Sequence, residues 1–227
     1  MSSDPYLLAI GSHKGGTGRT TAVLALAWLW GNDGLRVTLA DADPSAAAGL
    51  VALDPSGACP WPNVRYVTGL PEPGDPALDA DFVVIDCPAL LDPLAPPLLR
   101  RVHGVVLTCP SDPLALRTVP AAAGVLGAAR LFNPELELLG MLINRFDAAD
   151  AVQAPVLDRL RQAHGELLLE PPVPDDPAVR DWPLTPGAGL PLGLAADAFA
   201  AVAGRLRERA RRPAAVAAAA PADRREE

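Results

Sequence analysis

The chain has 227 residues and a formal net charge of −8 at pH 7, and half of its residues are apolar. That apolar share is enough to bury a core, so it excludes a disordered or fibrous chain. No apolar run reaches the roughly 18 residues of a membrane span, and three scattered cysteines exclude a disulfide framework. We therefore expect a soluble, cytoplasmic protein.

The basic residues are divided unevenly between the two types. Of the 19 lysines and arginines, 18 are arginine and one is Lys14. An arginine bias says nothing about function by itself. Against it, however, the single lysine indicates a position where arginine cannot replace lysine. The alternative is an accident of coding.

Short apolar runs alternate with longer helical patterns along the chain. Strands are predicted at residues 6–11, 36–40, 64–68, 82–86, 104–108, 138–144 and 166–169, and helices at 20–31, 114–131, 149–164 and 192–212. This alternation predicts an α/β fold with a mostly parallel, doubly wound sheet and helices on both faces. Residues 1–212 are expected to form one domain, and the Ala- and Pro-rich tail 213–227 to be disordered.

A glycine-rich turn, HKGGTGRTT at residues 13–21, joins the first predicted strand to the first predicted helix. Glycines in that position let successive backbone N–H groups hold phosphate oxygens, and the helix N-terminus adds its positive dipole end. The hydroxyl of Thr20 is then placed to bind Mg²⁺. A turn that only connects strand to helix is the alternative, which three glycines in four positions disfavour.

The segment KGGTGRTT, residues 14–21, resembles the phosphate loop KGGxGK[ST][ST] of the ParA/MinD family of deviant Walker A ATPases. The resemblance implies a P-loop NTPase architecture, ATP and Mg²⁺ as ligands, and a catalytic Lys14 that reaches the phosphates of a partner across a nucleotide-sandwich dimer. The nucleotide-binding residues that it implies in the loop are Gly15, Gly16, Thr17, Gly18, Arg19, Thr20 and Thr21.

Arg19 is the one departure from that loop pattern, because the family has a second lysine there. Arginine is larger and planar, so the geometry over the β- and γ-phosphates changes. Its charge can still neutralise phosphate, and we expect nucleotide binding to survive. Hydrolysis depends on finer positioning. Both slow hydrolysis and a nucleotide-binding switch with little or no turnover therefore stay open.

Three carboxylates stand at predicted strand ends. Asp41 and Asp43 follow the second strand in a DxDP element, and Asp86 ends the apolar strand FVVID. The resemblance implies that Asp43 positions the attacking water and that Asp41 supports the Mg²⁺ shell. Asp86, at a buried strand end, would hold Mg²⁺ through water. A solvated turn rich in Asp and Pro is the alternative for the DxDP element.

Two later elements resemble the family's adenine pocket. Asn144 ends the strand LLGMLIN, and an amide there can both donate to and accept from the base. Pro172, Val173 and Pro174 match the short segment that forms a wall of this pocket, with Asp175 in place of the usual arginine. The motifs occur in the family's order over residues 6 to 206.

A cluster of arginines ends the last predicted helix. Arg205, Arg209 and Arg212 share one face of that helix. The resemblance implies non-specific DNA binding through phosphates, whereas the alternative is that these cations complement the helix dipole. The helix lacks the bulky apolar residues of a membrane anchor. The loop begins by residue 13, so no N-terminal helix-turn-helix is expected.

Together these features predict a ParA-like ATPase that forms an ATP-bound homodimer, associates with the nucleoid through DNA and hydrolyses ATP slowly with Mg²⁺. A ParB-like partner would stimulate it, and its task would be chromosome or plasmid segregation or cargo positioning. The first alternative is a dimeric switch with little hydrolysis. The second is a metabolic enzyme of the same fold, such as an amide-forming synthetase, which would need a further charged substrate pocket.

Overall fold

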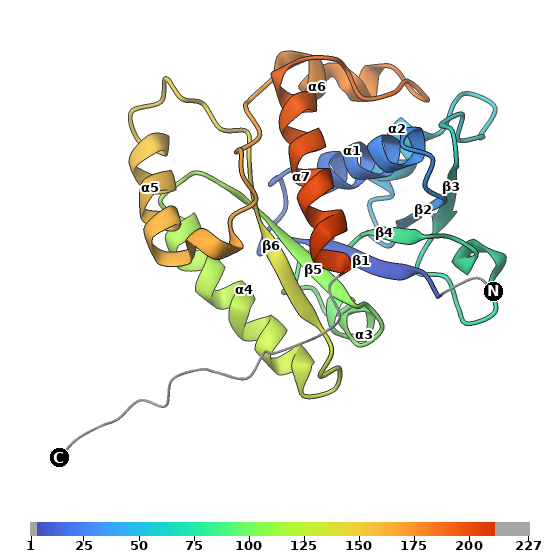
Figure 1. Ribbon diagram of the computed structural model, residues 1–227, viewed down its shortest axis with the longest axis horizontal. Coiled ribbons are helices and arrows are strands. Elements are labelled where there is room, and N and C mark those ends of the chain that lie inside the picture. The colour runs from blue at the N-terminus through green and yellow to red at the C-terminus, as the bar shows by residue number, and fades with distance from the viewer. Residues whose placement is uncertain (1–3, 212–227) are drawn as a thin grey trace.

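The structure is a computed structural model that describes residues 4–211. One sheet of six parallel strands lies at its centre, in the order β3-β2-β4-β1-β5-β6 (Figure 1). The strands are Tyr6–Gly11 (β1), Val37–Asp41 (β2), Val64–Thr68 (β3), Phe82–Asp86 (β4), Gly104–Pro110 (β5) and Glu137–Asn144 (β6). The parallel sheet confirms the predicted fold class.

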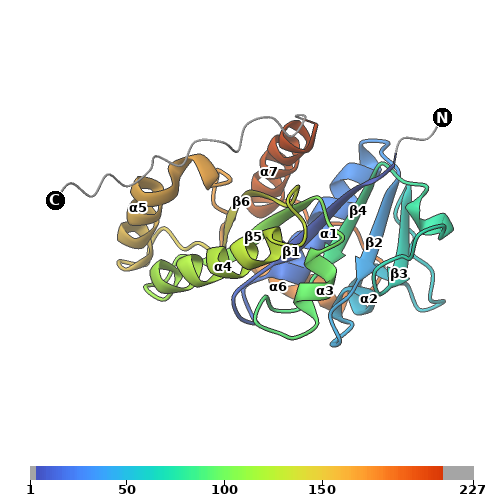
Figure 2. The ribbon, with the colours of Figure 1, turned by 90° about the horizontal axis from the view of Figure 1, so that it is seen from below.

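Helices cover both faces of this sheet (Figures 1 and 2). Helices α1, α2 and α7 pack on one face, and α3, α4 and α5 pack on the other. The helices are Arg19–Asn32 (α1), Ala47–Ala52 (α2), Ala95–Leu99 (α3), Ala115–Arg130 (α4), Gln153–His164 (α5), Pro177–Asp181 (α6) and Leu194–Ala210 (α7). This arrangement is the doubly wound one that the alternating pattern predicts.

Two apolar cores result, one on each face. Side chains alternate along a strand, so Leu8 and Ile10 of β1 point into one core and Ala9 points into the other. A central parallel strand is buried on both faces, which is why β1 reads as a continuous apolar run. The sheet is thereby fixed between its helices.

The strand register brings the predicted site to one edge of the sheet. Ile10 of β1 and Asp41 of β2 both lie opposite Asp86, at the end of β4. On the other side of β1, Pro110 of β5 lies opposite Asn144 of β6. The carboxyl ends of parallel strands are where ligands bind in open α/β sheets.

The predicted strand at 166–169 is wrong. Residues Gly165–Leu167 form a 3₁₀ turn, and Leu168 makes only an isolated bridge to Met141 of β6. Pro171 and Pro172 follow at once, and a proline has no N–H to continue a ladder. The chain therefore touches the sheet edge without extending it.

The other differences concern short helices and chain ends. Helices α2, α3 and α6 have five or six residues each and were not expected from the sequence. Residue 212 and the tail 213–227, which the sequence predicts to be disordered, lie outside the described residues. Within residues 4–211 no helix has the length and apolar character needed to cross a membrane.

Candidate functional site

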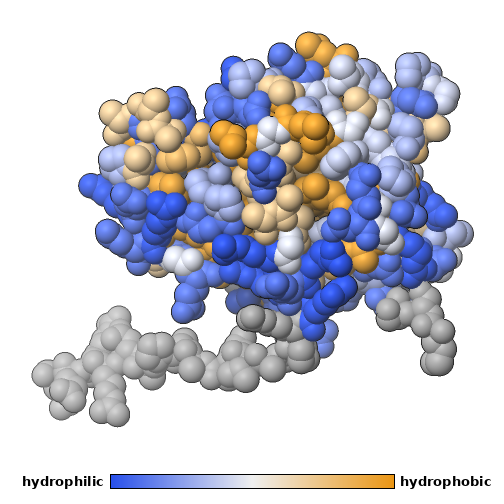
Figure 3. All heavy atoms as spheres, turned by 45° about the horizontal axis from the view of Figure 1, so that its top comes forward, coloured by the Kyte–Doolittle hydropathy of each residue, from blue (hydrophilic) through white to orange (hydrophobic). Residues whose placement is uncertain are grey.

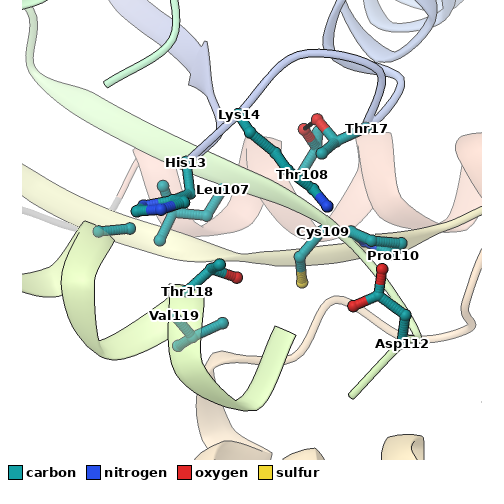
Figure 4. Close-up of a pocket in the computed structure, with 11 residues that line it drawn as sticks. His13, Lys14, Thr17, Leu107, Thr108, Cys109, Pro110, Asp112, Thr118 and Val119 are labelled. Carbon is teal, nitrogen blue, oxygen red and sulfur yellow. Dashed lines mark hydrogen bonds between the residues drawn. The ribbon is translucent and has the colours of Figure 1, made fainter. Parts of the chain in front are cut away.

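The loop between β1 and α1 is held by neighbouring strands. Gly16 and Gly18 have φ angles of 77° and 84°, in the left-handed region that glycine adopts without strain. The Thr17 hydroxyl is 2.8 Å from that of Thr108 on β5. Figure 4 shows these two side chains side by side. A Cβ atom on Gly18 would overlap the Asn144 amide. The loop thus needs glycine both for its turn and for a close approach.

Asn144 ties the loop to β6. Its buried amide nitrogen donates to the carbonyl oxygens of Thr17 and Gly18 at 3.4 and 3.3 Å. Its oxygen accepts the backbone N–H of Arg145 at 2.9 Å. The amide therefore holds the loop in this structure, and its predicted contact with adenine stays a prediction.

Lys14 extends from the loop over the end of β5, toward Cys109 and Pro110 (Figure 4). The residue is exposed, and among the described residues no carboxylate pairs with its ammonium group. His13, on the preceding position, lies beside Leu107, and its Nδ1 is buried without a hydrogen-bond partner in residues 4–211. An unpaired exposed lysine suits a ligand outside the chain, although its role stays a prediction.

Arg19 turns toward the ends of β2 and β4. Its guanidinium donates to the carbonyl oxygen of Cys87 and lies 3.0 Å from Oδ2 of Asp43. The side chains of Arg19 and Asp43 are only 12% and 14% exposed. Partial burial acts to raise the pKa of Asp43, but hydrogen bonds from Ser45 and the Arg19 guanidinium outweigh it and hold that pKa below its usual value. Asp43, the carboxylate predicted to position water, is therefore bound by Arg19, the residue predicted to bind phosphate.

Asp86 lies beneath the loop with one oxygen bound. The Thr20 hydroxyl donates to its Oδ2 at 2.7 Å, whereas its Oδ1 is buried with no partner in the described part of the chain. Burial raises the pKa of Asp86 to about 6, against the opposing effects of the Thr20 hydrogen bond and the Arg19 charge. A buried carboxylate without a cation is costly, so this group is poised for one.

Asp41 is the second carboxylate with a spare oxygen. Its Oδ2 accepts the backbone N–H of Gly49 at 3.1 Å and the hydroxyl of Tyr66 at 3.2 Å. Its Oδ1 is buried and has no partner within residues 4–211. Burial first, and then the charge of Asp41, raise the pKa of Tyr66 to about 12, which keeps that phenol protonated as a donor.

These residues fit a magnesium ion that has further ligands. The unpartnered oxygens of Asp41 and Asp86 and the hydroxyl of Thr20 are hard oxygen donors of the kind that Mg²⁺ prefers. Within the described chain, no three or more His, Cys, Asp or Glu side chains form a group that could hold a metal. Magnesium is commonly held by one or two protein groups together with substrate phosphates and water.

A pocket of about 450 Å³ extends from the loop to the segment after β6. At one end it is lined by Gly16, Gly18, Arg19, Thr20 and Thr21. At the other end it is lined by Asn144, Arg145, Val173, Pro174, Asp175, Asp176, Val179, Arg180 and Pro183. Of the three predicted wall residues, Val173 and Pro174 line this pocket and Pro172 does not. The site is thus a continuous space with a phosphate-loop end and a second end where apolar and charged side chains meet.

A second, polar pocket of about 380 Å³ lies on the Lys14 side of the loop. Asp112 and Asp147 line it, but each accepts a backbone N–H two or three residues further along, from Ala115 and Ala149 at 2.9 Å. Such bonds stabilise local turns. Two of the three carboxylates that line this pocket, Asp112 and Asp147, therefore stabilise local turns, and the third is Asp175.

The sequence interpretation missed several residues at the site. Arg145 and Arg180 line the main pocket, and Tyr66 holds Asp41. Arg145 could have been found, because it directly follows Asn144 at a strand end where ligand-binding loops emerge. Arg180 and Tyr66 reach the site through long-range packing, which no local pattern indicates.

Two of the three predicted DNA-binding residues, Arg205 and Arg209, lie on α7 and do not line the main pocket. Arg209 donates to the carbonyl oxygens of Leu139 and Glu166, so it fastens α7 to β6 and to the turn after α5. Arg205 is exposed, and Arg212 lies outside the described residues. Their contact with DNA stays a prediction, and the placement of Arg209 does not favour it.

Known proteins resemble the chain in sequence and in fold. It is 28% identical over 208 residues to the chromosome-partitioning ATPase Soj of Thermus thermophilus, which covers 78% of this chain and 84% of Soj. In fold it resembles the cell division ATPase MinD of Pyrococcus furiosus, with a TM-score of 0.68 and 24% identity over 89% of this chain and 98% of MinD.

A further fold relative is an enzyme, cobyrinic acid a,c-diamide synthase of Mycobacterium smegmatis, whose structure contains ADP and magnesium. Its TM-score is 0.64, with 24% identity over 86% of this chain and 91% of the synthase. At such identities these structures show a shared fold. The family model described as "CobQ/CobB/MinD/ParA nucleotide binding domain" matches residues 8–186, more than half of the chain. The chain belongs to this MinD/ParA family of nucleotide-binding domains.

Proposed function

We propose that this protein is a ParA-like ATPase that binds ATP with Mg²⁺ at the loop and hydrolyses it slowly. The observation that carries the proposal is the meeting of the loop hydroxyl of Thr20 with Asp86, beside the pair formed by Arg19 and Asp43. Family membership and the resemblance to a chromosome-partitioning ATPase support the same activity.

In this proposal the residues of the loop and of the strand ends bind the phosphates, the magnesium ion and the attacking water. Backbone N–H groups of residues 15–21 hold the phosphates at the start of α1. Thr20 would hold Mg²⁺, Asp86 would hold it through water, and Asp41 would support that shell. The ion would supply positive charge that neutralises the phosphates. Asp43 would orient the attacking water.

Arg19 makes this hydrolysis slow. A guanidinium has five N–H donors in a planar fork. Arg19 donates hydrogen bonds to the Cys87 carbonyl and to Asp43, and it also lines the pocket. It can therefore bind phosphate, but its contact with Asp43 restrains the orientation in which that carboxylate can accept a hydrogen bond from water. A switch that binds nucleotide with little or no turnover is the limiting case of the same contact.

Dimerisation, DNA and a stimulating partner complete the proposal. The unpaired, exposed Lys14 suits the phosphates of a second copy. Exposed leucines lie on α2, after α6 and at the start of α7, and Figure 3 shows apolar surface among charged surface on that side. These leucines are Leu50, Leu184, Leu192 and Leu194. We assign the DNA contact to non-specific phosphate binding at the nucleoid and the stimulation to a ParB-like protein, from the resemblance to Soj.

A metabolic enzyme of the same fold is the second candidate. The polar pocket beside Lys14 and the fold shared with the synthase favour it. We prefer the ATPase because Asp112 and Asp147 in that pocket already serve as acceptors for local turns.

The test is ATP turnover by the purified protein and its Arg19→Lys variant, with and without duplex DNA, beside a nucleotide-binding titration. Slow turnover that Asp43→Ala abolishes, while the exposed Glu135→Ala control keeps it, supports the ATPase. Binding without turnover, with turnover appearing in Arg19→Lys, identifies the switch. Absence of ATP binding refutes both.

A further inference from the structure

The base end of the main pocket holds a charged group of three residues. Asp175 lies between two arginines, with its Oδ1 3.9 Å from Nε of Arg145 and its Oδ2 3.3 Å from a terminal nitrogen of Arg180. All three residues line the pocket. The sequence indicates only that Asp175 stands where the family usually has arginine.

The backbone fixes the position of Asp175. The Val173 N–H donates to Ile143 at 2.8 Å, the Phe146 N–H to Val173 at 2.9 Å, and the Asp175 N–H to Phe146 at 2.9 Å. These bonds and an isolated bridge between Phe146 and Pro174 hold this segment beside the end of β6. They fix the backbone that carries the Asp175 carboxylate, as a binding site requires.

Arg145 adopts a conformation that arginine rarely takes. Its φ angle is 56°, in the left-handed region, and its N–H is bound by the Asn144 side chain at 2.9 Å. Such backbone strain clusters at ligand sites, where the surrounding structure maintains it. Here it accompanies a guanidinium that lines the pocket wall beside Asp175.

The carboxylate keeps room for another donor. Its two ion pairs have long distances of 3.9 and 3.3 Å. They are also partly exposed, because the side chains of Arg145, Arg180 and Asp175 are 62%, 59% and 34% exposed. An ionised carboxylate offers about four lone-pair positions, of which two arginines take at most half. Asp175 can therefore accept an N–H from a ligand without losing its arginines.

We propose that Asp175 is a base-specificity residue: it accepts a hydrogen bond from an N–H group on the edge of a bound purine. With phosphates at the loop, the base falls at this end, between the apolar groups of Val173, Pro174, Val179 and Pro183. Asn144 has its N–H donors on loop carbonyls, and its oxygen already accepts the Arg145 N–H. The inference rests on the proposed nucleotide site, whose base preference it specifies.

The experiment uses three purine triphosphates that differ in donors on that edge. ATP has an amino group, GTP has an amino group and a ring N–H, and purine riboside triphosphate has neither. A hydrogen bond to a charged acceptor corresponds to at least about tenfold in affinity, so we expect purine riboside triphosphate to bind the native chain about tenfold more weakly than ATP. GTP is expected to compete with ATP.

Asp175→Ala should reduce the ratio of the affinities for ATP and purine riboside triphosphate to about two or less. Asp175→Asn, which keeps a neutral acceptor, should give an intermediate affinity ratio. Asp181→Ala is the matched control, because Asp181 lies on the neighbouring α6 but does not line the pocket. Thermal unfolding of each variant verifies the fold.

Equal binding of ATP and purine riboside triphosphate to the native chain would overturn the inference, and so would an unchanged ratio in Asp175→Ala. In either case the proposed ATPase still stands. Failure of all three triphosphates to bind would instead refute the nucleotide site itself, and the inference with it.

Discussion

The two ends of the main pocket hold their charges in different ways. At the loop end, Arg19, Asp43 and Asp86 are mostly buried, and each side chain depends on a neighbour for its hydrogen bonds. At the base end, Arg145, Asp175 and Arg180 are half exposed and separated by longer distances. Buried charges are expensive to leave unpaired, whereas exposed pairs contribute little. Changes at the loop end should therefore disrupt binding or chemistry, and changes at the base end should only adjust preference.

The largest effect is expected from Gly18→Ala. Alanine would be strained at a φ angle of 84°, and its Cβ would overlap the Asn144 amide, so the loop must move. We expect nucleotide affinity to fall by about 100-fold or more, measured by titration calorimetry. Gly124→Ala, in open space on α4, is the control and should leave affinity unchanged. Native-like affinity in Gly18→Ala would show that the overlap is easily relieved.

Asp86→Asn should stabilise the free protein at pH 7. The folded-state pKa of Asp86 is raised from 3.8 to about 6 by burial, so the folded protein binds this proton more tightly than the unfolded chain. The stability that the protonated Asp86 contributes is fully present below about pH 4 and is lost as pH rises through about 6. Urea unfolding without Mg²⁺ or nucleotide should show a gain of up to about 3 kcal/mol for Asp86→Asn at pH 7.

The pH dependence supplies the control for this prediction. The gain in the free energy of unfolding from Asp86→Asn should be smaller at pH 5, where the Asp86 carboxyl of the native protein is largely protonated. Asp54→Asn, on an exposed turn, should not reproduce it. A gain that is equal at both pH values would mean that burial does not shift the titration of Asp86.

Arg19→Lys should raise turnover by about tenfold. A lysine ammonium is a point donor and cannot hold the Cys87 carbonyl and Asp43 with the same planar fork, so the Asp43 carboxylate is less restrained and can turn toward the attacking water. Steady-state phosphate release measures the change. Arg36→Lys, which alters an exposed arginine that pairs with Asp79 and Asp81, should leave turnover unchanged. Lower turnover in Arg19→Lys would contradict the restraint assigned to Arg19.

The smallest effect is expected at the base end. Arg180→Ala removes one half-exposed partner of Asp175, an ion pair that contributes less than about 1 kcal/mol, so ATP affinity should change by about fivefold or less. The same titration measures it. A loss as large as that of Gly18→Ala would mean that the two ends are not different in kind.

Local signals in the sequence predicted most of the elements that build the site. Continuous apolar runs located β1 and β4, and glycine spacing located the loop. Helix α6, by contrast, has five residues and none of them is buried. It starts at an Asp176 cap followed by a proline, a local signal that the sequence interpretation did not use. The strand expected at 166–169 failed for a different reason, because pairing with β6 depends on the prolines that follow it and on the path of the chain.

The contacts between site residues were the harder part. The sequence placed Arg19 over phosphates, whereas the structure places its guanidinium on Asp43 and Cys87, 24 and 68 positions away. Likewise, the amide of Asn144 reaches the loop across more than 120 residues. Such partners are fixed by the order of strands in the sheet, which short motifs do not specify.

The single lysine has a practical consequence for experiments. Amine-directed reagents distinguish lysine from arginine, so within the chain they can react at Lys14 and at the terminal amine, and at no other side chain. A fluorophore or crosslinker attached there would sit on the loop itself, in a protein of native sequence. Its protection on addition of a ligand, or its transfer to a second molecule, would report events at that loop without any mutation.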